Sequence, residues 1–158
     1  MLERPLWISA LSAIPSNELI EFTEKISEGW TLTPKAVPQA GLGMLKLKDS
    51  AFNEAFYLGE FPLASAWLEV ITDDGEKAEG AAQVMDDQIE VAEALALCDA
   101  ILSAQLPGWE KVSMMIEKGF TIQDATRRKR KMMLARTRVD FSLLDNTGNE
   151  AVQNNVES

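Results

Sequence analysis

Histidine is absent from this chain of 158 residues, and Cys98 is its only cysteine. Without histidine the chain cannot build a Ser-His-Asp or Cys-His nucleophile, and a zinc site made of histidine and cysteine ligands is excluded as well. One cysteine cannot form an internal disulfide or hold an iron–sulfur cluster. Catalysis by this chain alone would therefore depend on carboxylates, lysines, Tyr57 or a hard cation such as Mg²⁺.

Long apolar runs are also missing, and no stretch approaches the ~20 residues that a transmembrane helix needs. The first residues look like a secretory signal only superficially, because Glu3 offsets Arg4 and two serines, Ser9 and Ser12, interrupt the apolar stretch. We therefore expect a cytoplasmic protein. The chain is 46% hydrophobic and 25% charged, so it can bury a core, and its length fits one domain.

Positive charge is scarce and unevenly distributed. The 15 Lys and Arg stand against 25 Asp and Glu, and a net charge of −10 disfavours nucleic acid or an anionic membrane as the main partner. Residues 118–138 are the exception, with eight bases and one acid. They contain the run RRKRK from Arg127 to Lys131, which we call the basic turn.

The basic turn cannot lie in a core, because helical residues advance by ~100° and five successive cations surround the helix. It either stays in solvent beside the acidic remainder of the chain or meets an acidic partner protein. Binding of phosphate or nucleic acid is the third alternative, which the net charge opposes.

Apolar residues spaced by three and four predict helices near both ends of the chain. Pro15, Gly29, Pro107 and Gly119 mark the helix ends. The predicted helices span 7–14, 16–28, 87–106, 109–119 and 121–138.

Alternation with a period of two predicts strands in the middle of the chain. These strands span 44–48, 56–58, 64–71 and 78–84, and Asp73-Asp74-Gly75-Glu76 is a hairpin turn between the last two. The stretch 30–43 contains two prolines and two glycines and is interpreted as irregular or short extended structure. Within it, Gly41-Leu42-Gly43 indicates a turn rather than a dinucleotide-binding loop.

The strand and helix signals are segregated along the chain, which predicts the α+β fold class. We expect a small antiparallel sheet of about 3–5 strands, including a hairpin near 64–84. The sheet should pack against helices, and a helical arm should follow at the C-terminus.

Two carboxylate pairs, Asp73-Asp74 and Asp86-Asp87, raise a magnesium hypothesis, because hard cations prefer oxygen ligands. Turn chemistry explains the first pair better, and a helix cap explains the second. Cys98 lies on the apolar stripe of its helix, which favours a buried structural thiol over a nucleophile. We therefore predict no catalytic, cofactor-binding or metal-binding residue in this chain.

Six stretches in a consistent order carry a family resemblance. They are RPLWISAL at 4–11, GLGM at 41–44, FYLGE at 56–60, VMDD at 84–87, EALALCDAIL at 93–102 and TRVDF at 137–141. Together they resemble the PhnG family, the G subunit of the bacterial carbon–phosphorus lyase core complex. The resemblance covers 4–144 and implies a single domain over 1–144. The polar tail at 145–158 has too little apolar surface to fold alone, so we expect it to be disordered.

The resemblance implies an assembly or accessory subunit in phosphonate degradation, with no cofactor of its own. Its implied partners are the H, I and J subunits, two copies of each, with an ATP-binding K subunit able to attach. The complex transfers ribose triphosphate from ATP to a phosphonate, releases adenine and gives α-D-ribose 1-phosphonate 5-triphosphate. The alternative is a stand-alone ligand- or RNA-binding module that uses the basic turn, and an independent carboxylate/magnesium hydrolase is a third hypothesis.

The segment from Thr121 to Leu144 is the predicted partner interface. It mixes cations with adaptable apolar side chains, a combination that suits an interface better than a core or open solvent. Arg138 and Asp140 would project from the same face of an extended segment and determine its register. The predicted interface residues are Arg127, Arg128, Lys129, Arg130, Lys131, Met132, Met133, Arg138, Asp140 and Phe141.

Overall fold

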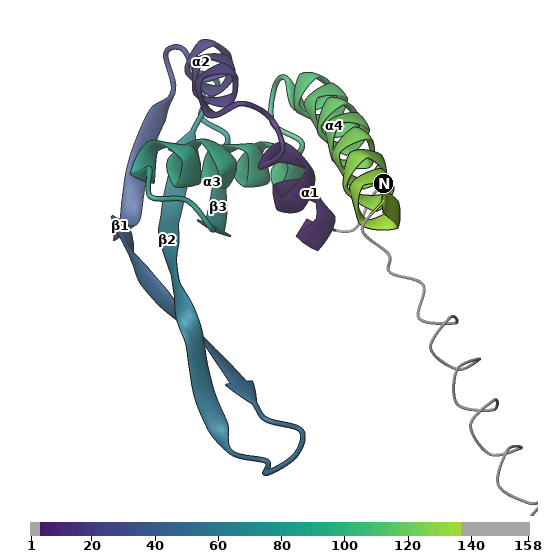
Figure 1. Cartoon of the computed structure of the whole chain (residues 1–158). Helices are drawn as coiled ribbons and strands as arrows, with labels where there is room; N and C mark the ends of the chain where they lie inside the picture. The colour runs from purple at the N-terminus through teal and green to yellow at the C-terminus, as the bar shows by residue number, and fades with distance from the viewer. Residues whose placement is uncertain (1–3, 137–158) are drawn as a thin grey trace, which may run out of the picture. The chain divides into compact units, whose positions relative to one another are not determined.

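The structure is a computed structural model, and it describes residues 4–136. Helices and strands follow one another in the order α1, α2, β1, β2, β3, α3, α4 (Figure 1). Their bounds are α1 Arg4–Leu11, α2 Ser16–Ile26, β1 Thr31–Lys48, β2 Ala55–Ile71, β3 Lys77–Val84, α3 Ile89–Ala104 and α4 Trp109–Arg136.

The chain divides into two compact units, Met1–Gln123 and Asp124–Ser158. The first unit contains the sheet, the first three helices and α4 as far as Gln123. The described part of the second unit is the remainder of α4, residues 124–136. The domain limits of 1–144, with a tail at 145–158, stay a prediction.

The sheet has three strands in the order β1-β2-β3, and both pairings are antiparallel. The predicted α+β class and the hairpin near 64–84 are therefore confirmed. Ala64 pairs with Val84 at one end of this hairpin and Ile71 with Lys77 at the other. Gly75 has a φ of 83° in the connecting turn, a conformation that glycine adopts without steric cost.

The core lies between α3 and one face of the sheet. Alternate residues of β2, Ala64, Ala66, Leu68 and Val70, are buried, and α3 contacts β2 and β3 on that side. Small side chains on the strands allow α3 to approach closely. At Gly80 of β3 an added Cβ would lie 2.0 Å from the carbonyl oxygen of Ala96 and 2.4 Å from the amide nitrogen of Ala100.

Two sequence predictions about the strands are wrong. The stretch 30–43 is not irregular, because β1 begins at Thr31, and Gly41 and Gly43 lie inside this strand rather than in a turn. The predicted strands at 56–58 and 64–71 are one strand, β2. Hydrogen bonds to β2 keep this stretch extended, although its local sequence does not indicate a strand. The pairing shifts register beside Pro34 and again between Ala36 and Gln39, where Pro38 lies, as expected for prolines in an edge strand.

The helices 109–119 and 121–138 that the sequence predicts are a single helix, α4. Gly119 does not end the helix but provides a contact with α1, since an added Cβ there would lie 2.1 Å from the carbonyl oxygen of Ala10. The cap predicted at Asp87 is also wrong. Gln88 occupies the N-cap position of α3 without a side-chain cap, and the Asp86 carboxylate accepts a hydrogen bond from the Gln88 amide at 2.9 Å.

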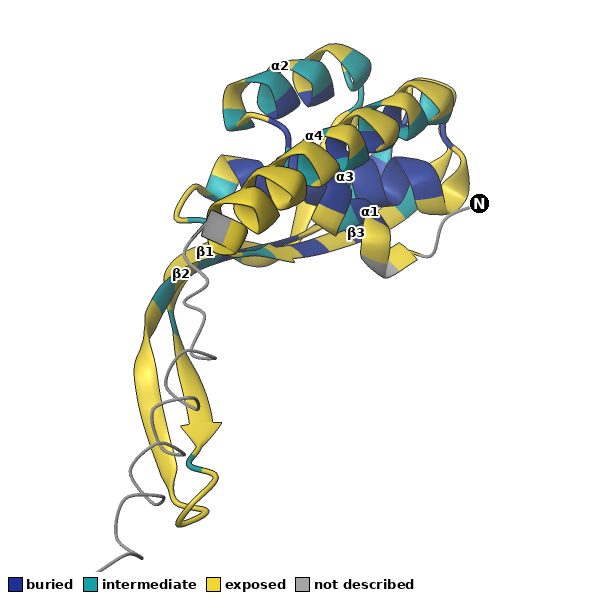
Figure 2. Cartoon of the chain, turned by 45° about the vertical axis from the view of Figure 1, so that its right-hand side comes forward, coloured by how far each residue is buried: buried dark blue, intermediate teal, exposed yellow. Residues whose placement is uncertain are grey.

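Beyond the core, β1 and β2 continue as a two-stranded ribbon that extends away from the helices of the first unit (Figures 1 and 2). We call residues 41–48 and 55–63 of these strands the hairpin arm. β3 pairs only with residues 64–71 of β2, so neither outer edge of the arm is paired with a strand of the sheet. The loop at its end is ordered by Asp49, whose carboxylate accepts hydrogen bonds from the amides of Ala51 and Phe52.

The close contact between α3 and β3 leads to a prediction about stability. Gly80→Ala should lower the free energy of unfolding by about 3 kcal/mol, because the new methyl group would meet the α3 backbone. Gly41→Ala is the matched control in a strand, since nothing lies within 4 Å of its added Cβ, and it should change stability by less than about 0.5 kcal/mol. Urea unfolding followed by circular dichroism measures both, and equal stability of the two variants would contradict the packing described here.

Candidate functional site

The basic turn lies on the part of α4 that belongs to the second unit, and all five cations from Arg127 to Lys131 are exposed. This confirms the predicted exclusion of the turn from a core. Arg127 is 81% exposed, and its Nη1 lies 4.0 Å from Oδ1 of Asp124, one helical turn earlier. A pair at that distance and exposure contributes little stability, so the cations stay available to a partner.

Met132 and Met133 follow the basic turn directly, and both side chains are about 60% exposed. Cations and flexible apolar side chains therefore share one exposed segment of the second unit. The other three residues of the predicted interface, Arg138, Asp140 and Phe141, lie outside the described residues. The assignment of all ten residues to a partner interface stays a prediction.

The carboxylates of the magnesium hypothesis do not form a common site. Asp73 and Asp74 belong to the exposed turn between β2 and β3, and Asp86 is engaged with the backbone of Gln88. Within residues 4–136, no group of three or more acidic or cysteine side chains is placed to hold a metal ion.

Asp99 is a buried carboxylate that the sequence analysis did not single out. It lies on α3 with 3% of its side chain exposed and accepts two hydrogen bonds from Arg4, from Nε at 2.8 Å and from Nη2 at 2.6 Å. It also accepts a hydrogen bond from the backbone amide of Ala81, with a donor–acceptor distance of 3.0 Å. The hydrogen bond and the charge of Asp99 both raise the pKa of Arg4. Asp99 thus joins α1, α3 and β3. The sequence signal that could have identified it is that Asp99 is the only charged residue in the otherwise apolar stretch ALALCDAIL.

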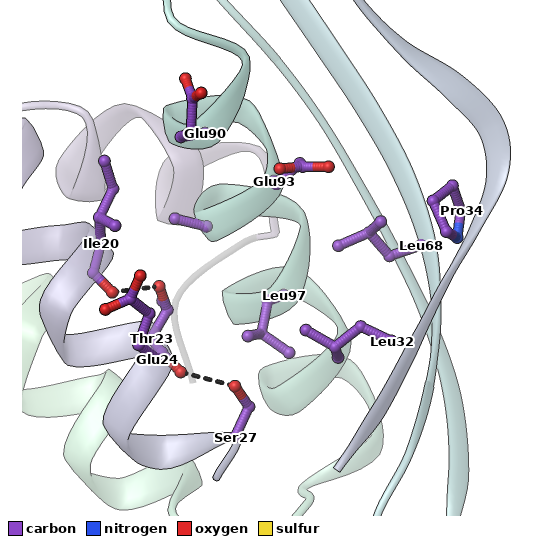
Figure 3. A pocket seen from close by; sticks show the side chains of 11 residues that line it. Ile20, Thr23, Glu24, Ser27, Leu32, Pro34, Leu68, Glu90, Glu93 and Leu97 are labelled. Atoms are coloured by element: carbon purple, nitrogen blue, oxygen red, sulfur yellow. Dashed lines mark hydrogen bonds between the residues drawn. The ribbon is translucent and has the colours of Figure 1, made fainter. Parts of the chain in front are cut away.

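The first unit contains a cavity of about 230 Å³ between α2, α3 and the sheet (Figure 3). Ile20, Leu32, Leu68 and Leu97 are among its apolar lining residues. The charged residues that line it are Glu24, Glu90 and Glu93. No cation lines the cavity, so its carboxylates would repel a phosphonate or the phosphates of a nucleotide.

Cys98 is fully buried in α3, as its position on the apolar stripe predicts. Burial, and to a smaller extent the negative charge of Asp99, raise the pKa of its thiol to about 12. The thiol is therefore protonated at neutral pH and does not act as a nucleophile, which requires the thiolate.

These observations describe a small α+β protein whose buried thiol and acidic cavity do not fit an anionic phosphorus substrate, and whose cations are displayed on an exposed helix. Comparison with protein families supplies the assignment. The model of the family described as phosphonate metabolism protein PhnG matches residues 2–145, and the chain belongs to this family. The protein therefore functions in phosphonate metabolism.

No curated protein matches the chain. Among residues 4–136, none of the helices combines the length and the apolar character that a membrane crossing requires.

The buried thiol predicts how stability depends on pH. Well below the ordinary thiol pKa of 9.0, Cys98 is protonated in both the folded and the unfolded chain and contributes no pH dependence. Between pH 9 and about 12 the unfolded chain releases a proton that the folded chain keeps, so the free energy of unfolding falls with rising pH. At pH 10.5 this loss should be about 2 kcal/mol relative to pH 8.

Cys98→Ala is the control, because it removes this titration and leaves every other titrating group in place. Urea unfolding at pH 8 and pH 10.5 should show a drop in stability that is about 2 kcal/mol smaller in the variant than in the wild type. The same drop in both proteins would show that the thiol is not buried as described.

Proposed function

We propose that this chain is an assembly subunit of the carbon–phosphorus lyase core complex in the cytoplasm. Its partners are the H, I and J subunits, with two copies of each subunit in the complex and an ATP-binding K subunit able to attach. The complex transfers ribose triphosphate from ATP to a phosphonate, releases adenine and gives α-D-ribose 1-phosphonate 5-triphosphate. The chain itself contributes binding surface rather than reacting groups to this transferase.

The observation that carries the proposal is the exposed segment Arg127–Met133 of α4. Five cations and two methionines are displayed together, and none of these seven side chains is buried. Methionine adapts to irregular partner surfaces, and cations at the rim of an interface accelerate association and select the orientation. Membership of the PhnG family supports the same role, because it links the chain to phosphonate metabolism.

The chemistry of the described residues supports a division of labour within the complex. Two buried groups that could react are engaged in the fold: the Cys98 thiol is protonated, and the Asp99 carboxylate accepts hydrogen bonds from Arg4 and Ala81. The cavity beneath α2 is acidic and does not suit an anionic substrate. In this proposal the partner subunits bind ATP and the phosphonate.

A stand-alone RNA- or ligand-binding module is the second candidate, and the exposure of the basic turn favours it. The net charge of −10 opposes it, since the remainder of the chain would repel a polyanion. Binding of an RNA oligonucleotide by the purified chain at physiological salt, with loss of binding on neutralisation of the basic turn, would favour this candidate over assembly.

The role of the C-terminal segment is tested by truncation. A chain that ends after Arg136 lacks TRVDF and should recover at least tenfold less of the H, I and J subunits when all four are co-expressed. The matched control ends after Asp145, where the family match stops, and should recover the same amount as the full chain. The measurement is affinity purification with quantified subunit yields. Undiminished recovery by the shorter chain would exclude this segment from the interface.

The basic turn should affect the rate of assembly more than the lifetime of the complex. Replacing Arg127 to Lys131 by glutamine should lower the association rate about tenfold at low salt and reduce its dependence on salt, with little change in dissociation. Surface plasmon resonance against the remaining subunits measures both rates. Glutamine at the exposed Lys25, Lys77 and Lys111 is the control for loss of positive charge elsewhere on the chain and should leave the rates almost unchanged. Faster dissociation as the main effect would contradict a role at the rim.

A further inference from the structure

The hairpin arm has two different faces, and their chemistry follows from the strand register. Directly paired residues of antiparallel strands project from the same side of the sheet. The pairs Leu47–Phe56, Leu45–Gly59 and Gly43–Phe61 therefore share one face, which we call the apolar face. Leu58 is the extra residue at the register shift between Leu45 and Lys46.

The apolar face carries no charged side chain. Leu45, Leu47 and Phe56 are each about 40% exposed, and the ring of Phe61 lies against Gly43, where an added Cβ would come within 2.6 Å of the ring. The missing side chain at Gly43 thus leaves room for the Phe61 ring. Three large apolar side chains in a row on one exposed face are characteristic of a binding surface.

The opposite face, which we call the mixed face, carries charge. It contains the pairs Leu42–Pro62, Met44–Glu60, Lys46–Tyr57 and Lys48–Ala55, and Lys46 Nζ lies 5.9 Å from the centre of the Tyr57 ring. Met44 and Tyr57 are about 60% exposed. Lys46, Lys48 and Glu60 keep charge on this face, so a partner that meets its lysines has to supply complementary charge.

A ribbon of two strands is at best marginally stable in water by itself. Outside the core of the first unit the arm is exposed throughout most of its length (Figure 2), and both of its edges lack a neighbouring strand of the sheet. A two-stranded arm of this kind is stabilised when the surface of another molecule covers its apolar face. The arm therefore has the properties of a segment that is completed by binding.

A second copy of this chain does not fit as the occupant of the arm's free β1 edge. Two β1 edges that pair antiparallel about a two-fold axis near this segment would place Lys46 and Lys48 of one copy close to the same lysines of the other. Like charges across paired strands are destabilising, and lysines on edge strands oppose such pairing. A partner of different sequence, with carboxylates at these positions, would instead be attracted.

We propose that the hairpin arm docks through Leu45, Leu47 and Phe56 into an apolar groove of a partner subunit, with partner carboxylates facing Lys46 and Lys48. The proposal rests on the proposed function, since it takes the partner to be a subunit of the phosphonate complex. It adds a second contact surface in the first unit, independent of the basic turn and the C-terminal segment. Phe56 is the central anchor, because large aromatic side chains contribute most of the binding energy of an interface.

Two double variants distinguish the faces of the arm. Leu47→Ser with Phe56→Ser removes the directly opposed pair of the apolar face and should lower recovery of the co-expressed H, I and J subunits at least tenfold. Met44→Ser with Tyr57→Ser removes two large side chains from the mixed face but leaves Lys46 and Lys48 in place, so it should keep recovery within twofold. The urea unfolding midpoints of both variants should match the wild type, because the arm lies outside the core.

The charge component is tested separately. Lys46→Glu with Lys48→Glu should lower recovery of the subunits about tenfold, while Lys46→Gln with Lys48→Gln should have a smaller effect, since only the former introduces repulsion. Equal recovery by the glutamate and glutamine variants would overturn the assignment of partner carboxylates.

The outcomes separate the arm from the proposed function. If the wild type recovers the subunits and both serine variants recover them equally well, the arm is not a docking surface and the proposed function stands. Equal loss in both variants would overturn the assignment of the apolar face. If the wild type recovers no H, I or J subunit, the proposed function fails and the arm proposal fails with it. Sedimentation that shows a dimer of the isolated wild type, lost only in the apolar-face variant, would make a second copy the occupant.

Discussion

The close approach of α3 to β3 is the contact on which the first unit depends. Gly80 leaves no side chain between the strand and the helix, so the backbones of Ala96 and Ala100 lie where a methyl group would otherwise be. This proximity places Asp99 within hydrogen-bonding distance of the Ala81 amide, and the same carboxylate holds Arg4 of α1. The absence of a side chain at Gly80 therefore allows α1, α3 and β3 to be connected by the buried carboxylate of Asp99.

The same contact explains why two buried groups of the first unit, Cys98 and Asp99, have structural roles. Burial beneath the sheet raises the pKa of Cys98, and Asp99 is occupied by its three hydrogen bonds. What the protein presents to its surroundings lies elsewhere, on the hairpin arm and on the exposed part of α4. A subunit of a phosphonate complex can use such surfaces to position other chains, while its own core remains chemically inert.

Two features of the candidate site could be predicted from the sequence, because they depend only on local helix geometry. Exposure of Arg127 to Lys131 follows from the sweep of five cations around a helix, and burial of Cys98 follows from its place on an apolar stripe. The role of Asp99 could not be predicted in this way. Its partner Arg4 is 95 residues away in the chain, and its other donor is a backbone amide that carries no sequence signal.

The sequence by itself determined the α+β class, the helix α3 and the hairpin turn at Gly75, because periodicity and turn chemistry act over a few neighbouring residues. Only the tertiary structure decided that β1 extends from Thr31 to Lys48 and that α4 continues through Gly119. In both places proline or glycine suggests an interruption. Hydrogen bonds to the distant strand β2 sustain β1, and Gly119 accommodates the backbone of α1, so contacts between remote segments overrode the local preference.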